Sequence, residues 1–303
     1  MSAWRHPNQR VVSELPLQLR RTGVPVAVRA WVGRRCGSAV VDVHRLPGAS
    51  STAVHAVRLA DGRRLVLRRY VWEQLRREEP EAPARELAAL DLAAGQQLPV
   101  PVVVAADVTG REAGDGAPAI LMTRVAGRAH PSPDPWQLAA LAADVHNVSA
   151  AGFEHHYFPW CRATCTRPPA GCRDPDLWNR ALHVWHTDEP PYEPRFIHRD
   201  FHPGNVLSRR GRLTGLVDWA HACTGPVGID IATCRFNLAE WAGPAVGDAF
   251  VAAYEQRSGQ HHHPYWDIAR LVEDDWDLID APDRVAQTEL LLSHAMQRWN
   301  QRT

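Results

Sequence analysis

The side chains best suited to chemistry lie within one short stretch, residues 196–219. It contains Asp200, then Asn205 five residues later, and Asp218 at the end of the next apolar run. Magnesium at phosphoryl-transfer sites prefers one or two carboxylates together with substrate phosphates, and a further carboxylate can serve as base for a substrate hydroxyl. The types and spacing of these three residues therefore predict a phosphoryl-transfer site.

Local sequence also predicts how these residues are positioned. Residues 205–208 and 213–218 are typical of two short strands, joined by a polar Arg-Arg-Gly-Arg turn. Asn205 begins the first strand and Asp218 ends the second, so we expect both at the open end of a hairpin, where two metal ligands can converge. Asp200 lies just ahead, on a loop. The alternative is a surface loop with chance carboxylates, which requires type, order and spacing all to coincide.

These segments resemble a known family. Residues 198–205, His-Arg-Asp-Phe-His-Pro-Gly-Asn, and residues 217–219, Val-Asp-Trp, are similar to the catalytic and metal-binding segments of the aminoglycoside phosphotransferase family, which has the protein-kinase-like fold. The resemblance implies that Asp200 accepts the substrate proton and that Asn205 and Asp218 bind the metal. A tryptophan after the metal aspartate is common in these small-molecule kinases, whereas protein kinases carry Phe-Gly, so a small-molecule acceptor is favoured.

The resemblance also assigns supporting roles. Residues 225–230, Gly-Pro-Val-Gly-Ile-Asp, resemble the family segment whose aspartate supports the catalytic loop, which gives Asp230 that role. His198 follows an apolar Phe-Ile pair that would anchor it to the core. Arg199 departs from the family pattern, because family members often have glycine there, and its role is left open.

The first part of the chain has the pattern of a nucleotide-binding lobe. We expect strands at 40–46, 53–59, 64–70, 102–105 and 119–122, with a helix at 84–94. The turn after the first strand would cover phosphates with backbone N–H groups and hydroxyls. Its one glycine makes a plain hairpin turn a strong alternative. The nucleotide-binding candidates in this turn are Gly48, Ser50, Ser51 and Thr52.

Arg68 lies on the third expected strand, where the kinase fold usually places a lysine that holds the α- and β-phosphates. The chain contains no lysine. Arginine keeps the positive charge and can bind phosphate through two N–H groups, although it is not geometrically equivalent to lysine. Its expected partner is Glu86, near the start of the helix. An outward-facing arginine and a solvated carboxylate favoured by the helix dipole are the alternatives.

Residues 123–127, Thr-Arg-Val-Ala-Gly, resemble the hinge between the two lobes of the family. By that resemblance the Thr123 carbonyl and the Val125 amide would contact the adenine edge. The predicted fold class is α+β, with a protein-kinase-like bilobal fold: a small antiparallel sheet with one key helix, then a larger, mainly helical lobe. The expected boundaries are residues 1–125, including an N-terminal extension at 1–39, and residues 126–303.

The acceptor site is the least determined part. Carboxylates crowd residues 273–283, and Glu273, Asp277 and Asp280 would share one helix face. An acidic wall would attract a cationic, hydroxyl-rich substrate such as an aminoglycoside. A solvated helix face explains the same pattern at least as well.

Composition excludes several other classes. The chain has 303 residues with 45% hydrophobic content, enough for one large or two modest domains. Its net charge of +0 argues against a general nucleic-acid binder. No apolar run approaches the roughly 18 residues of a membrane span, and the start of the chain lacks a signal-peptide core. We therefore expect a cytoplasmic protein with reduced thiols and no membrane or nucleic-acid partner.

A cluster of histidines and cysteines between residues 155 and 172 could bind zinc, but it lacks paired Cys-x-x-Cys units. Its members are His155, His156, Cys161, Cys165 and Cys172.

Together these patterns predict an enzyme, a monomer or homodimer, that moves the γ-phosphate of ATP to a hydroxyl of a small molecule with Mg²⁺ as cofactor. GTP is an alternative donor. An aminoglycoside-like antibiotic is the favoured acceptor, which would make the protein an antibiotic-resistance enzyme. The alternatives are another small hydroxylated acceptor, such as an amino alcohol, a sugar or a different antibiotic, and a non-catalytic nucleotide-binding regulator. The regulator is disfavoured because all three core polar residues are present.

Overall fold

The computed structural model describes residues 19, 23–49, 51–130, 133–160, 165–273 and 282–302. Two compact units divide the chain. The first consists of residues 1–130 together with 204–222, and the second of residues 131–203 together with 223–303. The first unit is thus discontinuous. The lobe boundary expected at residue 125 stays a prediction.

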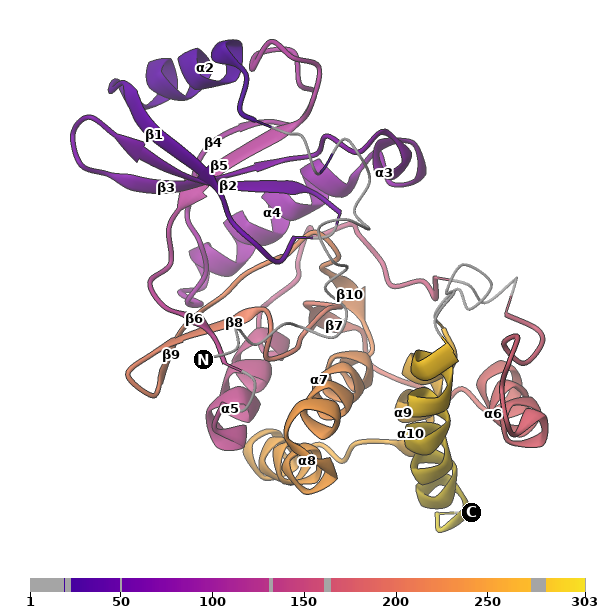
Figure 1. Ribbon diagram of the computed structural model, residues 1–303. Helices are drawn as coiled ribbons and strands as arrows, with labels where there is room; N and C mark the ends of the chain where they lie inside the picture. The colour runs from indigo at the N-terminus through magenta and orange to yellow at the C-terminus, as the bar shows by residue number, and fades with distance from the viewer. Residues whose placement is uncertain are drawn as a thin grey trace. The chain divides into compact units, whose positions relative to one another are not determined.

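The first unit contains an antiparallel sheet of five strands in the order β1-β2-β3-β5-β4 (Figure 1). Each strand predicted in this region is present. Most residues of β2 and β3 are buried on both faces, as expected for inner strands of a sheet that is covered on both sides. The bounds are Val40–Arg45 for β1, Ala53–Leu59 for β2, Arg64–Arg69 for β3, Val103–Asp107 for β4 and Ala119–Thr123 for β5.

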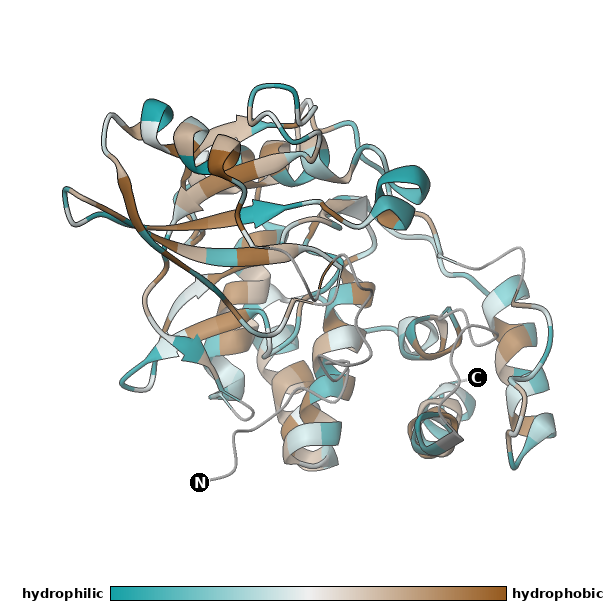
Figure 2. Cartoon of the chain, turned by 45° about the horizontal axis from the view of Figure 1, so that its top comes forward, coloured by the Kyte–Doolittle hydropathy of each residue, from teal (hydrophilic) through white to brown (hydrophobic). Residues whose placement is uncertain are grey.

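Helices lie on both faces of this sheet (Figure 1). Helix α2, Val26–Cys36, packs Trp31 and neighbouring valines against leucines of β2, β3 and β5. Helix α4, Ala82–Gly95, contacts β4 and β5, and the short α3, Glu73–Glu78, precedes it. Helix α4 is the key helix predicted at 84–94, whereas α2 falls in the segment expected to be an extension. Figure 2 shows hydrophobic residues along the strands and hydrophilic residues on the exposed turns.

A second, three-stranded sheet, β6-β8-β9, also belongs to the first unit. Its strands are Arg128–Ala129, Val206–Arg209 and Arg212–Leu216. The Leu216 amide donates to the Pro99 carbonyl at 2.8 Å. A Cβ added at Gly215 would lie 2.6 Å from Cγ1 of Val125, so only glycine permits this close packing. These contacts explain why residues 204–222 group with the N-terminal part of the chain.

The second unit is mainly helical, as predicted, and the α+β class is confirmed. Asp134 caps α5 by accepting from the Trp136 amide at 2.9 Å, with Pro135 in the first helical position. A two-stranded antiparallel sheet pairs β7, Arg195–Ile197, with β10, Cys223–Gly225. The helices are α5 Pro135–His146, α6 Pro175–Thr187, α7 Val227–Ala242, α8 Pro244–Ser258, α9 Pro264–Val272 and α10 Pro282–Asn300.

Aromatic side chains fill the core of this unit. Trp178 and Trp185 of α6 are buried with Tyr265 and Trp266 of α9. Helix α7 approaches α9 closely at Gly228, where an added Cβ would lie 2.1 Å from Cδ1 of Trp266. In the described ranges of both units, no helix combines the length and the apolar character that crossing a membrane requires.

Candidate active site

Arg68 and Glu86 form a buried ion pair inside the first unit. Strand β3 places Arg68 and helix α4 places Glu86, with Nη1 of Arg68 3.1 Å from Oε1 of Glu86. The two side chains are only 7% and 2% exposed. The contact expected from the resemblance is therefore present, and neither the outward-facing arginine nor the solvated carboxylate describes these residues.

The carboxylate of Glu86 also receives two other donors. The Tyr70 hydroxyl donates to Oε2, and the Trp219 backbone amide donates to the same group. Burial raises the pKa of Glu86, while the positive charge of Arg68 opposes that rise. Burial by itself would lower the pKa of Arg68, but Asp218 and Glu86 raise it, so the guanidinium remains charged.

Asn205 and Asp218 lie at the open end of the β8–β9 hairpin, as the local sequence predicted. Val206 pairs with Leu216, and the Val217 amide donates to the Asn205 carbonyl at 2.9 Å. Oδ1 of Asp218 lies 2.6 Å from Nη2 of Arg68. Two hard-oxygen side chains are thus held by the hairpin, while their role as metal ligands stays a prediction.

Asp218 has a left-handed backbone, with φ of 70°. Left-handed residues other than glycine are uncommon, and aspartate is among the types that tolerate this conformation best. The strained turn directs the carboxylate toward Arg68 and leaves it about a third exposed. A non-glycine residue held in a sparsely populated conformation is a feature that clusters at functional sites.

The expected phosphate turn connects β1 to β2. Gly48 has φ of 107°, which favours glycine at this position. Thr52 is buried, and its hydroxyl has no hydrogen-bond partner within the part of the chain that the structure describes. Ser51 is half-buried, and Ser50 lies outside the described residues. An unsatisfied buried hydroxyl in this turn fits a site that a ligand completes.

The hinge candidates follow strand β5. The Thr123 amide donates to the Val102 carbonyl at 2.8 Å, and its hydroxyl accepts from the Val102 amide at 2.9 Å. The Val125 side chain packs against Gly215, whereas its amide makes no hydrogen bond among the described residues. The contact of this segment with adenine stays a prediction.

In the second unit, Asp230 holds the loop that carries Asp200. Its carboxylate is fully buried and accepts from the amides of His198 at 2.8 Å and Arg199 at 2.7 Å. The loop directly follows strand β7, and Asp230 lies in the first turn of α7. The supporting contact expected from the resemblance is present, and Asp200, the next residue, is left about a third exposed.

Sequence reasoning missed three residues around this loop. His146 of α5 lies 3.3 Å from Asp230 through Nε2 and 2.8 Å from the Tyr254 hydroxyl through Nδ1. His202 places Nε2 3.5 Å from Oδ2 of Asp200. No local pattern links α5, α7 and α8, so the contacts of His146 and Tyr254 were not predicted. The signal for His202 was its position two residues after the aspartate.

Arg199 and Glu273 form a second buried ion pair. Nη1 of Arg199 lies 2.8 Å from Oε1 of Glu273, and Nη2 lies 2.9 Å from Oε2. Glu273 is completely buried at the end of α9. This burial does not fit an acidic wall that faces the substrate. We therefore no longer expect Glu273 to contact the acceptor directly. Asp277 and Asp280 lie outside the described residues.

The histidine and cysteine cluster does not assemble as a metal site among the described residues, where no group of three or more potential ligands gathers. Nδ1 of His156 instead lies 2.8 Å from the Thr224 hydroxyl. Cys161 is outside the described residues. Cys165 takes part in a disulfide bond, so the expectation that every thiol is reduced is wrong.

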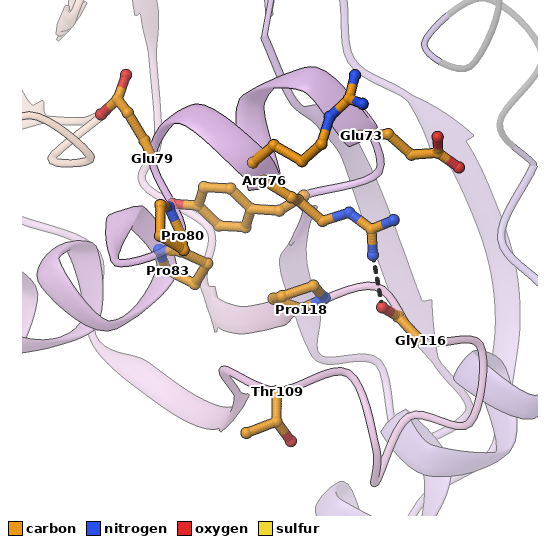
Figure 3. A pocket seen from close by; sticks show the side chains of 10 residues that line it. Glu73, Arg76, Glu79, Pro80, Pro83, Thr109, Gly116 and Pro118 are labelled. Carbon is orange, nitrogen blue, oxygen red and sulfur yellow. Dashed lines mark hydrogen bonds between the residues drawn. The ribbon is translucent and has the colours of Figure 1, made fainter.

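A cavity of about 440 Å³ opens beside α3 in the first unit (Figure 3). Arg76 donates to the Gly116 carbonyl at its edge, at 2.6 Å. Tyr70 lines this cavity, and its hydroxyl donates a hydrogen bond to the Glu86 carboxylate. The lining residues are Tyr70, Glu73, Arg76, Arg77, Glu79, Pro80, Pro83, Thr109, Gly116 and Pro118.

Residues 42–271 match the family model described as the phosphotransferase enzyme family. The chain belongs to the phosphotransferase enzyme family. The match runs from within β1 to within α9. It includes Arg68, Glu86, Asp218 and Arg199, and it ends two residues before Glu273. Membership makes the protein a phosphotransferase, a small-molecule kinase with a hydroxyl acceptor, and confirms the family and enzyme class expected from the sequence. No curated protein matches the chain.

Solved structures of several phosphotransferases and kinases share the fold. A thermostable mutant of the aminoglycoside phosphotransferase APH(4)-Ia, bound to ADP and hygromycin B, is 16% identical, with a TM-score of 0.64 over 90% of this chain and 98% of that chain. A type VIII aminoglycoside-3'-phosphotransferase is 21% identical, with a TM-score of 0.54 over 89% and 97%. A protein assigned as a fructosamine-3-kinase from Thermobifida fusca is 20% identical, with a TM-score of 0.59 over 90% and 100%. These likenesses confirm the kinase-like fold.

Proposed function

We propose that this phosphotransferase moves the γ-phosphate of ATP to a hydroxyl of a small molecule and uses Mg²⁺, with an aminoglycoside as the favoured acceptor. The observation that carries the proposal is the bridge that Arg68 makes between Glu86 and Asp218. Through one charged group, Arg68 joins strand β3, helix α4 and the β8–β9 hairpin that ends in Asp218. Such a constellation suits phosphate binding, in which the protein contributes mainly positioning and charge.

The residues of the first unit fit a nucleotide. Arg68 is a buried, charged guanidinium with no partner for Nε in the described part of the chain. The Thr52 hydroxyl is likewise a buried group without a partner there. Together with the Gly48 turn these donors would hold phosphates, and the Val125 amide would hold the base. ADP or AMP-PNP is bound by structural neighbours of the chain, which supports the same proposal.

The residues at the hairpin end fit magnesium. Asp218 would supply a carboxylate oxygen and Asn205 an amide oxygen, the hard ligands that this ion prefers. When bound, the ion would neutralise charge on the transferred phosphoryl group. Asp218 now contacts Arg68, so we expect the carboxylate to change partners or to be shared when the ion binds.

In the second unit, Asp200 would orient the acceptor hydroxyl and accept its proton. Its carboxylate is partly exposed, and the residue before it is held through its backbone by Asp230. A positioned base of this kind typically contributes about 10²- to 10⁴-fold in rate.

The burial of Glu273 favours considering a second class of acceptor. Its carboxylate is occupied by Arg199, which removes one of the three expected acidic contacts for a polycationic antibiotic. The resemblance in fold to a protein assigned as a fructosamine-3-kinase points to smaller sugar amines as the alternative. Acidic contacts from Asp277 and Asp280 remain part of the aminoglycoside proposal.

The test is magnesium-dependent transfer from labelled ATP to a panel of aminoglycosides, sugar amines and amino alcohols. Asp200→Asn should lose about 10²- to 10⁴-fold in kcat with ATP binding unchanged. Asp176→Asn, an exposed aspartate at the start of α6, is the matched control and should behave as wild type. Equal turnover by Asp200→Asn would refute the assigned base. Binding of ATP without transfer to any acceptor would favour the regulator.

A further inference from the structure

The pair formed by Arg199 and Glu273 has more contacts than a simple ion pair. The two terminal guanidinium nitrogens, Nη1 and Nη2, each donate to a different oxygen of the carboxylate. The guanidinium carbon lies 4.1 Å from the ring centre of Trp160 and 4.6 Å from that of Tyr157. Cation–π contacts of this kind are strongest where water is excluded. The arginine is therefore held in one orientation by its fork and by two aromatic faces.

The backbone of Arg199 is held as firmly as its side chain. Its amide donates to Asp230 at 2.7 Å, and its φ of 72° lies in the left-handed region. For a residue with a Cβ this conformation costs about 1–2 kcal/mol. It persists where surrounding contacts over-determine it. Asp230 of α7 and Glu273 at the end of α9 supply those contacts from two different helices.

Stability alone does not explain a buried ion pair at this position. Removing two charges from water is costly, and a well-packed apolar pair is often as stable or more so. What the ion pair adds is direction, because a bidentate carboxylate accepts the guanidinium in a single plane. The residue that receives this direction immediately precedes Asp200.

We propose that Arg199 and Glu273 are positioning residues for phosphoryl transfer: the buried pair sets the orientation of the loop that presents Asp200. The inference rests on the proposed role of Asp200 as the base. Glu273 touches no reacting atom and acts through Arg199. The rings of Tyr157 and Trp160 cover the guanidinium of Arg199. Arg270 makes a longer contact to the Glu273 carboxylate, at 3.8 Å.

The test compares two neutralised carboxylates at the two ends of α9. Glu273→Gln keeps the shape of the side chain and removes its charge. Asp267→Asn is the matched control, because Asp267 is also fully buried and holds Arg235 and Arg298, each at 2.8 Å. We expect Glu273→Gln to lower kcat by about 10- to 100-fold with KM for ATP unchanged, since a small misplacement costs that much. Asp267→Asn should keep kcat within about twofold even if it unfolds more easily.

Hydrogen exchange gives a readout that does not need turnover. The amides of His198 and Arg199 are bonded to Asp230, so they report the order of the loop. They should exchange faster in Glu273→Gln and at the wild-type rate in Asp267→Asn. Should Glu273→Gln fail to fold, Arg199→Lys replaces it, because one ammonium keeps the charge and loses the planar fork. Its kcat should fall less than that of Arg199→Gly.

The double variant Arg199→Gly with Glu273→Gln separates positioning from stability. Glycine adopts positive φ without strain and glutamine leaves no buried charge, so the double variant should be more stable than Arg199→Gly while kcat stays low. Wild-type kcat together with wild-type exchange in Glu273→Gln would overturn the positioning role. If the wild-type protein transfers phosphate to no acceptor, the proposed function fails, and the exchange comparison alone decides the inference.

Discussion

Replacing Arg68 by methionine tests the central ion pair of the first unit. With an effective dielectric constant of about 20, charges 3.1 Å apart attract by about 5 kcal/mol. Breaking a buried pair by removing one partner typically costs about 3–5 kcal/mol, because the remaining charge has no compensation. Glu86 is almost fully buried, so we expect Arg68→Met to lower the free energy of unfolding of the first unit by that amount near neutral pH.

The loss should depend on pH with a definite sign. Burial raises the pKa of Glu86 above its ordinary value of 4.5, and removing Arg68 takes away the charge that opposes the rise. A carboxyl group whose folded pKa is raised stabilises the fold below its unfolded pKa, and this stability is lost as pH rises through the folded value. The free energy of unfolding of the variant should therefore be closest to that of wild type at about pH 4.5, and the difference should grow as the pH rises above that value.

The assay is urea unfolding, monitored by hydrogen exchange at the amides of β3 and α4. A local probe is needed because a chain of two units need not unfold in one step. The companion is Arg68→Met with Glu86→Gln, in which no buried charge is left. It should recover most of the lost stability at neutral pH. A loss below about 1 kcal/mol for Arg68→Met, a loss independent of pH, or a double variant no better than the single one would refute this reasoning.

Four further outcomes are expected from single substitutions. Arg68→Lys should lower the free energy of unfolding by about 1.5–3 kcal/mol in thermal unfolding, because one ammonium replaces a fork whose two nitrogens reach separate carboxylates. Asp230→Asn should cost about 1.5–3 kcal/mol and speed exchange of the two loop amides, because an amide nitrogen cannot accept the bond that the carboxylate oxygen accepted. Gly228→Ala should cost about 1–3 kcal/mol in urea unfolding, because its Cβ would collide with Trp266. Gly95→Ala, whose Cβ would meet nothing within 4 Å, should stabilise α4 by about 0.4–1 kcal/mol.

Local patterns predicted the elements that carry the candidate site. The hairpin that holds Asn205 and Asp218, the strand of Arg68 and the helix of Glu86 were all predicted because strand periodicity, turn residues and helix patterns act over a few neighbouring residues. Helix α2 was not predicted. Its sequence has little contrast between faces, and its burial comes from packing on the sheet rather than from a local pattern.

The sequence by itself determined which residue types stand at which spacing, and hence the class of chemistry and the family. Only the tertiary structure decided which carboxylates are exposed. Glu273 belonged to an acidic run that indicated a solvated face or a substrate wall, yet it is buried against Arg199, which lies 74 residues away. The contacts of His146 and Tyr254 were equally invisible, because helices that meet in space need share no local pattern. Spacing along a chain constrains neighbours within a turn or a hairpin, whereas long-range packing selects which charges lose their water and must find a partner.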